Sequence, residues 1–134
     1  MTKKRILIVD DSFVMRALLR GIISADPDLA VVGEATNGLE ALQSIKELNP
    51  DLVLLDIEMP HMDGIECLKR LRLISNVPVI IVSSVAQTGS PQALETRKLG
   101  AAEVIAKPSG AMSLDLNAKK GHEIVTASRK VLGI

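Results

Sequence analysis

The sequence predicts an α/β domain in which a parallel five-stranded sheet is covered by helices on both faces. Two observations lead to this prediction. Five short aliphatic runs recur along the 134 residues, and segments with apolar residues at helical spacing separate them. Strands without clean polar alternation are typical of a sheet buried on both faces, and strands that alternate with helices indicate parallel pairing. A chain of this length builds one sizeable core, so we expect a single domain.

The five expected strands are runs rich in Val, Ile and Leu. They span Arg5–Asp10, Ala30–Ala35, Asp51–Asp56, Val77–Ser84 and Ala102–Ala106. Turn-forming prolines follow the first two helical segments, in Asp26-Pro27-Asp28 and Asn49-Pro50-Asp51. We therefore expect these helices to end at turns that return the chain to the next strand.

Apolar spacing and capping residues identify the helices. Apolar residues recur at three- and four-residue intervals in Met15–Ile23, Leu39–Leu48 and Ile65–Leu71. Asp11 or Ser12 is expected to cap the first helix, and Asp63 the third. A last helix is expected over Leu116–Leu132, and Gly121 within it leaves its starting point open.

The composition excludes several classes of function. Phe13 is the sole aromatic residue, so stacking on bases or on a flavin is not available. Lys and Arg together number 16, as do Asp and Glu, and this balance argues against direct nucleic-acid binding. The single cysteine, Cys67, allows no internal disulfide and is expected to be a buried or half-buried thiol. No apolar stretch reaches the length of a membrane helix, so we expect a cytoplasmic protein without membrane insertion.

Polar residues gather where the predicted strands end. Asp10 is the last residue of the first strand, and Asp11 follows it. Asp56 ends the third strand, Ser83 lies at the end of the fourth, and Lys107 follows the fifth. In a parallel sheet the carboxyl ends of the strands lie at one edge, where ligands bind. If the first and third strands are neighbours, three carboxylates converge there. The acidic pair alone could simply cap a helix, but the third carboxylate and the lysine make capping an insufficient explanation.

Converging carboxylates favour a bound cation because their charges repel one another. Every ligand on offer is an oxygen, which favours a hard divalent ion, Mg²⁺ first and Mn²⁺ as the alternative. Beside such an ion Asp56 can act as a nucleophile toward phosphorus and form an aspartyl phosphate. Ser83 offers a hydroxyl, and Lys107 a positive charge, to the phosphoryl oxygens.

These residues resemble the receiver domain of bacterial response regulators over about residues 4–130. The resemblance is carried by Asp10-Asp11, Asp56 with Met59-Pro60-His61-Met62-Asp63-Gly64 behind it, Ser83, and Lys107-Pro108. It implies a flavodoxin-like (βα)5 fold with strand order 2-1-3-4-5. It also implies that Asp56 is the phosphoacceptor, that Asp10, Asp11 and the Glu58 carbonyl bind the metal, and that Ser83 and Lys107 hold the phosphoryl group. The Lys-Pro bond is commonly cis in this family, and the phosphoryl donor is a histidine kinase.

A narrower resemblance concerns the output of the switch. Asp10-Asp11-Ser12 with Met15-Arg16, Val82-Ser83-Ser84, Lys107-Pro108-Ser109-Gly110 and Ser113-Leu114-Asp115-Leu116 are similar to the receiver of chemotaxis protein-glutamate methylesterases. In that family the receiver precedes a hydrolase domain and blocks it until phosphorylated. We therefore expect a receiver core over 1–110, with the last helix and the start of an interdomain linker over 111–134. The partners implied are a chemotaxis histidine kinase and a C-terminal methylesterase domain. This chain itself would catalyse only its own phosphorylation and dephosphorylation, because it has no Gly-x-Ser-x-Gly stretch.

The sequence departs from the receiver pattern at one position, and several alternative functions stay open. Receivers usually carry Tyr or Phe three residues before the lysine, where this chain has Val104. The signal is therefore expected to pass through the Ser83–Gln87 loop and the helix after it. A stand-alone receiver and a receiver joined to a DNA-binding output are alternative functions. A phosphatase using Asp56 as nucleophile is a third, although Glu58 stands where such enzymes place a second aspartate.

Overall fold

The structure, a computed structural model, describes residues 2–85, 89–107 and 114–134. Strands and helices alternate along the chain. The strands are β1 (Lys4–Val9), β2 (Leu29–Ala35), β3 (Leu52–Leu55), β4 (Val79–Ser83) and β5 (Glu103–Ala106). The helices are α1 (Phe13–Ser24), α2 (Gly38–Leu48), α3 (Gly64–Leu71), α4 (Pro91–Lys98) and α5 (Leu114–Leu132).

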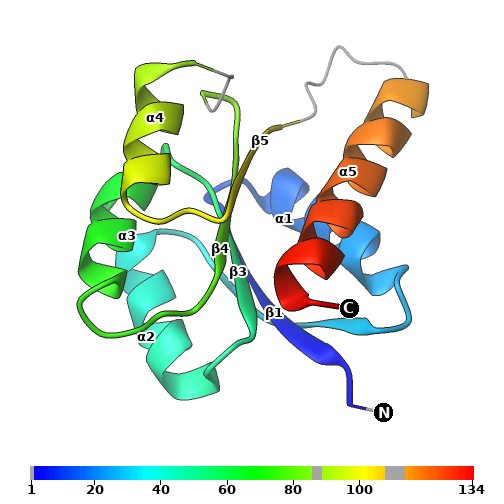
Figure 1. Cartoon of the computed structure of the whole chain (residues 1–134), viewed down its shortest axis with the longest axis horizontal. Helices are drawn as coiled ribbons and strands as arrows, with labels where there is room; N and C mark the ends of the chain where they lie inside the picture. The colour runs from blue at the N-terminus through cyan, green and yellow to red at the C-terminus, as the bar shows by residue number, and fades with distance from the viewer. Residues whose placement is uncertain (1, 86–88, 108–113) are drawn as a thin grey trace.

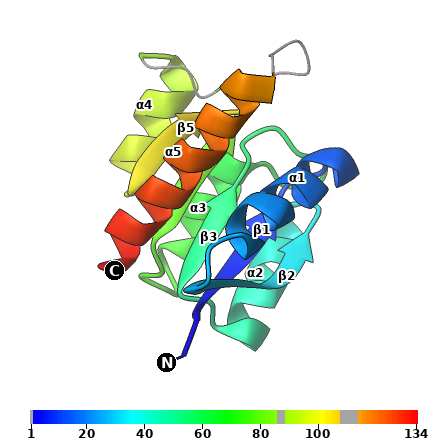
Figure 2. The same cartoon turned by 90° about the vertical axis from the view of Figure 1, so that its right-hand side faces the viewer.

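The strands form one parallel sheet in the order β2-β1-β3-β4-β5. Helices α1 and α5 cover one face, and α2, α3 and α4 cover the other (Figures 1 and 2). This arrangement confirms the predicted flavodoxin-like fold and its strand order. It also places β1 directly beside β3, which was the condition for the carboxylates at their ends to meet.

Both faces of the sheet are apolar, which explains why the strand sequences lack alternation. Leu7 and Val9 of β1 pack under α2 and α3, whereas Ile6 and Ile8 pack under α1 and α5. The same division holds along β3 and β4. Cys67 of α3 is a buried free thiol within the first of these two cores, as predicted, and burial raises its pKa to about 11.

The helix caps agree with the predicted start sites, and the structure shows which of the two candidate residues caps α1. The Ser12 hydroxyl accepts a hydrogen bond from the Met15 amide at 3.2 Å, so Ser12 and not Asp11 caps α1. Asp63 caps α3 by accepting from the Glu66 amide at 2.8 Å. Because Ser12 supplies the cap, the Asp11 carboxylate is left available for other contacts.

The last helix starts two residues earlier than predicted, at Leu114, and ends at Leu132 as expected. Gly121 lies within it because α5 approaches α1 closely there: a Cβ at this position would lie 3.3 Å from Cγ1 of Ile22. The predicted division near residue 110 falls outside the described residues. In the part of the chain that the structure describes, no helix is both long and apolar enough to cross a membrane.

Candidate functional site

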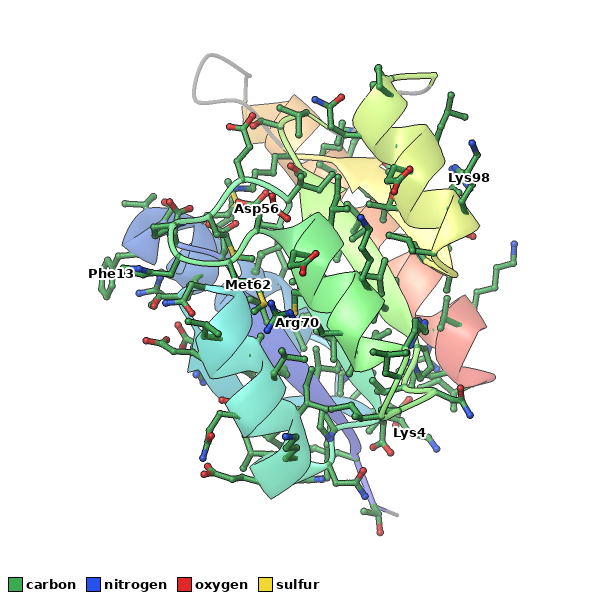
Figure 3. All side chains as sticks on the ribbon, turned by 90° about the vertical axis from the view of Figure 1, so that its left-hand side faces the viewer. Lys4, Phe13, Asp56, Met62, Arg70 and Lys98 are labelled. Carbon is green, nitrogen blue, oxygen red and sulfur yellow. The ribbon has the colours of Figure 1, made fainter. Side chains whose placement is uncertain are left out.

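The candidate site lies at the carboxyl edge of the sheet, where β1 and β3 end side by side. Asp56 sits there, at the far end of the molecule from Lys4, which begins β1 (Figure 3). Backbone hydrogen bonds carry the sheet one residue past each strand: the Asp10 amide donates to the Ala35 carbonyl and the Asp56 amide to the Val9 carbonyl, each at 3.0 Å. The sheet itself therefore places both aspartates.

Three carboxylates converge at this edge. Asp10, Asp11 and Asp56 each contribute an oxygen to a group whose members all lie within 4.8 Å of one another. Asp10 is completely buried and Asp56 is 3% exposed, whereas Asp11 faces solvent. Two buried carboxylates and one solvent-facing carboxylate thus form an acidic cluster, called the pocket below, that solvent reaches at Asp11.

Lys107 supplies the positive charge of the pocket. Its Nζ lies 2.7 Å from Oδ2 of Asp10 and 2.9 Å from Oδ2 of Asp56, and the side chain is only 12% exposed. The backbone is anchored because the Lys107 amide donates to the Ser83 carbonyl at 3.2 Å, extending the pairing of β5 with β4. The lysine therefore bridges the ends of β1 and β3 from β5, across β4.

The charges of this pocket do not balance. Three carboxyl groups face one ammonium group. Burial raises the pKa of the Asp10 carboxyl, an effect that outweighs its contacts with Lys107 and with the Ser12 amide. Burial alone would lower the pKa of Lys107, but the two carboxylates overcome this and raise it, so the lysine stays charged.

The donor set fits a hard divalent cation. All three carboxylates offer oxygen ligands, and such a cation would offset the excess negative charge. Oδ2 of Asp10 supports the same conclusion: it is buried, and the Lys107 ammonium that lies 2.7 Å from it is shared with Oδ2 of Asp56. One shared ammonium group does not offset the charge of all three carboxylates. Glu58 lies on the loop two residues after Asp56, and the role of its carbonyl stays a prediction.

Ser83 is completely buried at the end of β4. Its hydroxyl accepts a hydrogen bond from the Val85 amide at 3.4 Å, and within the described residues none of the three carboxylates is its partner. The structure thus brings Ser83 to the correct edge of the sheet but turns its hydroxyl toward its own loop. Accepting this bond does not use the hydroxyl hydrogen, which can still be donated to another acceptor.

A link runs from this loop to α4. The Val85 carbonyl accepts from the Ser90 hydroxyl at 3.0 Å, and the same hydroxyl caps α4 by accepting from the Ala93 amide at 3.1 Å. Val104, partly buried against the core, occupies the position at which the family usually has an aromatic residue. Residues 86 and 87 of the predicted Ser83–Gln87 route, and Pro108 of the expected cis bond, lie outside the described residues.

The loop after Asp56 is shaped by close backbone approach. The Gly64 amide donates to the Ile57 carbonyl at 2.7 Å, and a Cβ on Gly64 would lie only 2.0 Å from the Asp56 carbonyl oxygen. Only glycine fits at this position, which explains why the motif behind Asp56 ends in Asp63-Gly64. Sequence reasoning placed Gly64 in the family motif but did not identify this constraint.

Comparison with known families gives a consistent result. The family model described as "Response regulator receiver domain" matches residues 6–119. A protein-glutamate methylesterase/protein-glutamine glutaminase of Syntrophomonas wolfei is 49% identical over 116 residues, which cover 87% of this chain and 33% of that protein. One from Bacillus licheniformis is 45% identical over 128 residues, covering 93% and 36%. The chain thus spans about a third of the length of the curated relatives it matches.

Solved structures agree with this. The response regulator domain of Thermotoga maritima CheB superposes with a TM-score of 0.90 at 39% identity, over 98% of both chains. A structure titled as the P1 domain of CheA3 in complex with CheY6 from R. sphaeroides matches at a TM-score of 0.80 and 41% identity, over the whole of both chains. A CheX-CheY-BeF3-Mg²⁺ complex from Borrelia burgdorferi matches at 0.80 and 28% identity, over 97% of this chain and 90% of that one.

Gly64→Ala tests the constraint on the loop. The new methyl group would meet backbone atoms of Asp56 that cannot move without displacing the carboxylate, so we expect destabilisation by about 3 kcal/mol. Gly21→Ala is the matched control: it lies in α1 with nothing within 4 Å of the added Cβ and should stabilise by up to about 1 kcal/mol. Urea unfolding measures both. Equal free energies of unfolding for Gly64→Ala and the parent would contradict the account of this loop.

Addition of Mg²⁺ tests the charge imbalance. At about 100 times its dissociation constant a ligand specific for the folded state adds about 2.7 kcal/mol to the free energy of unfolding. We therefore expect Mg²⁺ to raise the melting temperature of the parent. A chelator should reverse this rise, and Asp11→Asn should reduce it. Glu47→Gln, which removes an exposed carboxylate from the far end of α2, should respond as the parent does. A similar rise in Asp11→Asn and the parent would argue against metal binding at this cluster.

Proposed function

We propose, from the premise that this chain belongs to the response regulator receiver domain family and is the receiver of a chemotaxis CheB-type regulator, that it accepts a phosphoryl group on Asp56 from a histidine kinase. The observation that carries the proposal is the position of the Lys107 ammonium, within 2.9 Å of both Asp10 and Asp56. Acidic clusters are common on protein surfaces, but a largely buried lysine between two buried carboxylates is not a solvated surface feature.

In the proposed reaction a carboxylate oxygen of Asp56 attacks the phosphorus of a phosphohistidine. An O–P bond forms, the N–P bond breaks, and the imidazole nitrogen leaves with its electron pair and takes up a proton. Mg²⁺, when bound by the carboxylates of Asp10, Asp11 and Asp56, supplies positive charge next to the phosphoryl oxygens. The Glu58 carbonyl would complete its ligand set.

After transfer, several side chains of the pocket would bind the phosphoryl oxygens or hold Asp56 in place. Lys107 already contacts Oδ2 of Asp56, and its ammonium would pair with a phosphoryl oxygen. Ser83 would donate its hydroxyl hydrogen to another phosphoryl oxygen, while its oxygen accepts from the Val85 amide. The amide of Ile57, which donates to Oδ1 of Asp56 at 2.8 Å, would hold the carboxylate in its orientation.

A histidine kinase is the proposed phosphoryl donor. Phe13 and Val14, each 75% exposed, lie on the first turn of α1, after the capping Ser12 that follows the acidic pair. Phe13 projects away from the body of the domain (Figure 3). An exposed aromatic residue beside a reactive pocket suits a protein partner. The neighbouring CheY6 structure, which is named as a complex with the P1 domain of CheA3, supports a kinase domain as that partner.

The proposed output is a protein-glutamate methylesterase domain on the same polypeptide. The curated relatives carry that name, and the matched region covers about a third of their length. Residues 1–110 would form the receiver core, and 111–134 the last helix and the start of the linker. A DNA-binding output receives less support, because the LuxR-family regulators among the structural neighbours are 28% identical. We further propose a cytoplasmic location, since the single thiol calls for no oxidising compartment.

Intact mass spectrometry tests phosphoryl transfer. After incubation with Mg²⁺ and a small phosphodonor such as phosphoramidate, the parent should gain the mass of one phosphoryl group, and Asp56→Asn should gain none. Asp51→Asn, which alters a carboxylate at the opposite end of the same strand, should be labelled like the parent. Omitting Mg²⁺ should slow labelling. The proposal fails if the parent gains no mass, or if Asp56→Asn is labelled equally.

Control of the output is tested on the longer polypeptide that would carry this receiver. Its methylesterase activity should rise when a phosphodonor and Mg²⁺ are added, and this rise should be lost in Asp56→Asn. Deletion of residues 1–110 should also raise the basal activity if the receiver blocks the hydrolase. Activity that ignores both the phosphodonor and the deletion would refute a methylesterase output while leaving phosphorylation of Asp56 intact.

A further inference from the structure

Arg16 is a largely buried cation that the proposed chemistry leaves without a role. It lies in the second turn of α1, and its side chain is only 13% exposed. Arginine is seldom buried unless its donors are paired. Its partners therefore indicate what the side chain is for.

The guanidinium of Arg16 reaches back to the end of β1. Nη1 donates to the backbone carbonyl of Asp10 at 2.7 Å. This carbonyl lies just beyond the last residue of β1, where the ladder with β3 has ended. The C=O of Asp10 and the N–H of Asp11 belong to one planar peptide unit. The contact consequently fixes the orientation of the peptide that joins the two acidic residues of the pocket.

A second contact holds the guanidinium itself in place. Nε of Arg16 donates to Oε1 of Glu34 at 3.1 Å, and Glu34 lies on β2 opposite Ile8 of β1. The other oxygen of Glu34, Oε2, accepts from Nε of Arg20, one turn further along α1, at 2.7 Å. The guanidinium also lies 5.9 Å from the centre of the Phe13 ring. Arg16 thus ties together α1, the end of β1 and β2.

With Arg16 in place, the polar groups of Asp10 are held from several sides. The Asp10 amide donates to the Ala35 carbonyl, its carbonyl accepts from Arg16, and Oδ1 accepts from the Ser12 amide at 2.8 Å. Oδ2 remains, directed toward Lys107 and the other carboxylates. A ligand oxygen held this way loses little conformational freedom when it binds a cation.

We propose that Arg16 is a positioning residue: it orients the Asp10–Asp11 peptide so that both carboxylates meet a divalent cation. This inference rests on the proposed function, because it assumes that the acidic pocket binds Mg²⁺. Arg16 itself touches neither the carboxylates of the pocket nor the reacting atoms, and acts through the backbone. The planar fork of arginine suits this task because Nη1 and Nε bind two fixed acceptors at once.

Positioning and simple electrostatics make opposite predictions for Arg16→Gln. Removal of a positive charge near a cation site should tighten Mg²⁺ binding through long-range Coulomb effects. Loss of a group that orients metal ligands should weaken it, typically 10-fold or more. Arg20→Gln is the matched control, since it removes the same charge from the same helix and the same Glu34 partner without removing the donor to Asp10.

The experiment measures the Mg²⁺ dissociation constant by titration calorimetry at fixed ionic strength, and the rate of phosphorylation across Mg²⁺ concentrations. Arg16→Gln should raise both the dissociation constant and the half-saturating Mg²⁺ concentration about tenfold. The phosphorylation rate at saturating Mg²⁺ should stay close to that of the parent. Arg20→Gln should leave both quantities within about twofold of the parent values. A purely structural role would instead lower the melting temperature without shifting the half-saturating concentration.

Arg16→Lys keeps the inference testable if the glutamine variant does not fold. Lysine retains the charge and one donor for the Asp10 carbonyl but cannot also present the fixed second donor to Glu34, so we expect Mg²⁺ binding about threefold weaker. Equal Mg²⁺ affinity in the Arg16 variants and Arg20→Gln, with a parent that binds Mg²⁺ and is labelled on Asp56, would overturn this inference alone. A parent that binds no Mg²⁺ would overturn the proposed function together with it.

Discussion

The site depends on one electrostatic constraint: parallel strands bring like charges together, and something must hold them there. Because β1 lies between β2 and β3, the carboxylates of Asp10 and Asp56 are forced to the same edge of the sheet. Both are buried, where their repulsion is poorly screened. The Lys107 ammonium offsets part of that repulsion but leaves an excess of negative charge. The remaining negative charge favours a bound cation, and such a cation would in turn offset the charge of a phosphoryl group.

The location of the site follows from general rules that act on the sequence. Aliphatic runs without alternation predict buried parallel strands, and polar residues at their ends predict a ligand site at one edge of the sheet. The structure brings Asp10, Asp11, Asp56 and Lys107 together at that edge, and Ser83 lies there as well. These residues could be placed from the sequence because each lies within one or two residues of a strand end, and the strand ends all lie at the same edge of the sheet.

Other features depend on side-chain geometry that no periodicity reveals. The direction of the Ser83 hydroxyl toward Val85 is set by its loop. The need for Gly64 arises because the backbone of α3 passes close to the Asp56 carbonyl, two segments that touch only in the folded chain. Arg16 could have been noticed as a charged residue one helical turn after a capping serine, but its bond to the Asp10 carbonyl appears only once the helix is docked.

The fold alone would not identify the function, because the same doubly wound sheet serves unrelated chemistries. The specific evidence is local: a lysine between two buried carboxylates, and a third carboxylate at the open side of the pocket. The receiver family and the methylesterase relatives agree with this local evidence. Val104 stands where receivers usually carry an aromatic residue. Hydrogen bonds join Val85 to Ser83 and to Ser90 at the start of α4, and passage of a signal along this route stays a prediction.

The central claim is that Asp56 carries the phosphoryl group, and chemical trapping of the acyl phosphate tests it most directly. Borohydride reduces an aspartyl phosphate to homoserine, which peptide sequencing by mass spectrometry assigns to a position. The account predicts homoserine at position 56 alone, dependent on prior treatment with Mg²⁺ and a phosphodonor. Homoserine at position 10 or 11, or a phosphoryl group that resists borohydride and is found on Ser83, would contradict it.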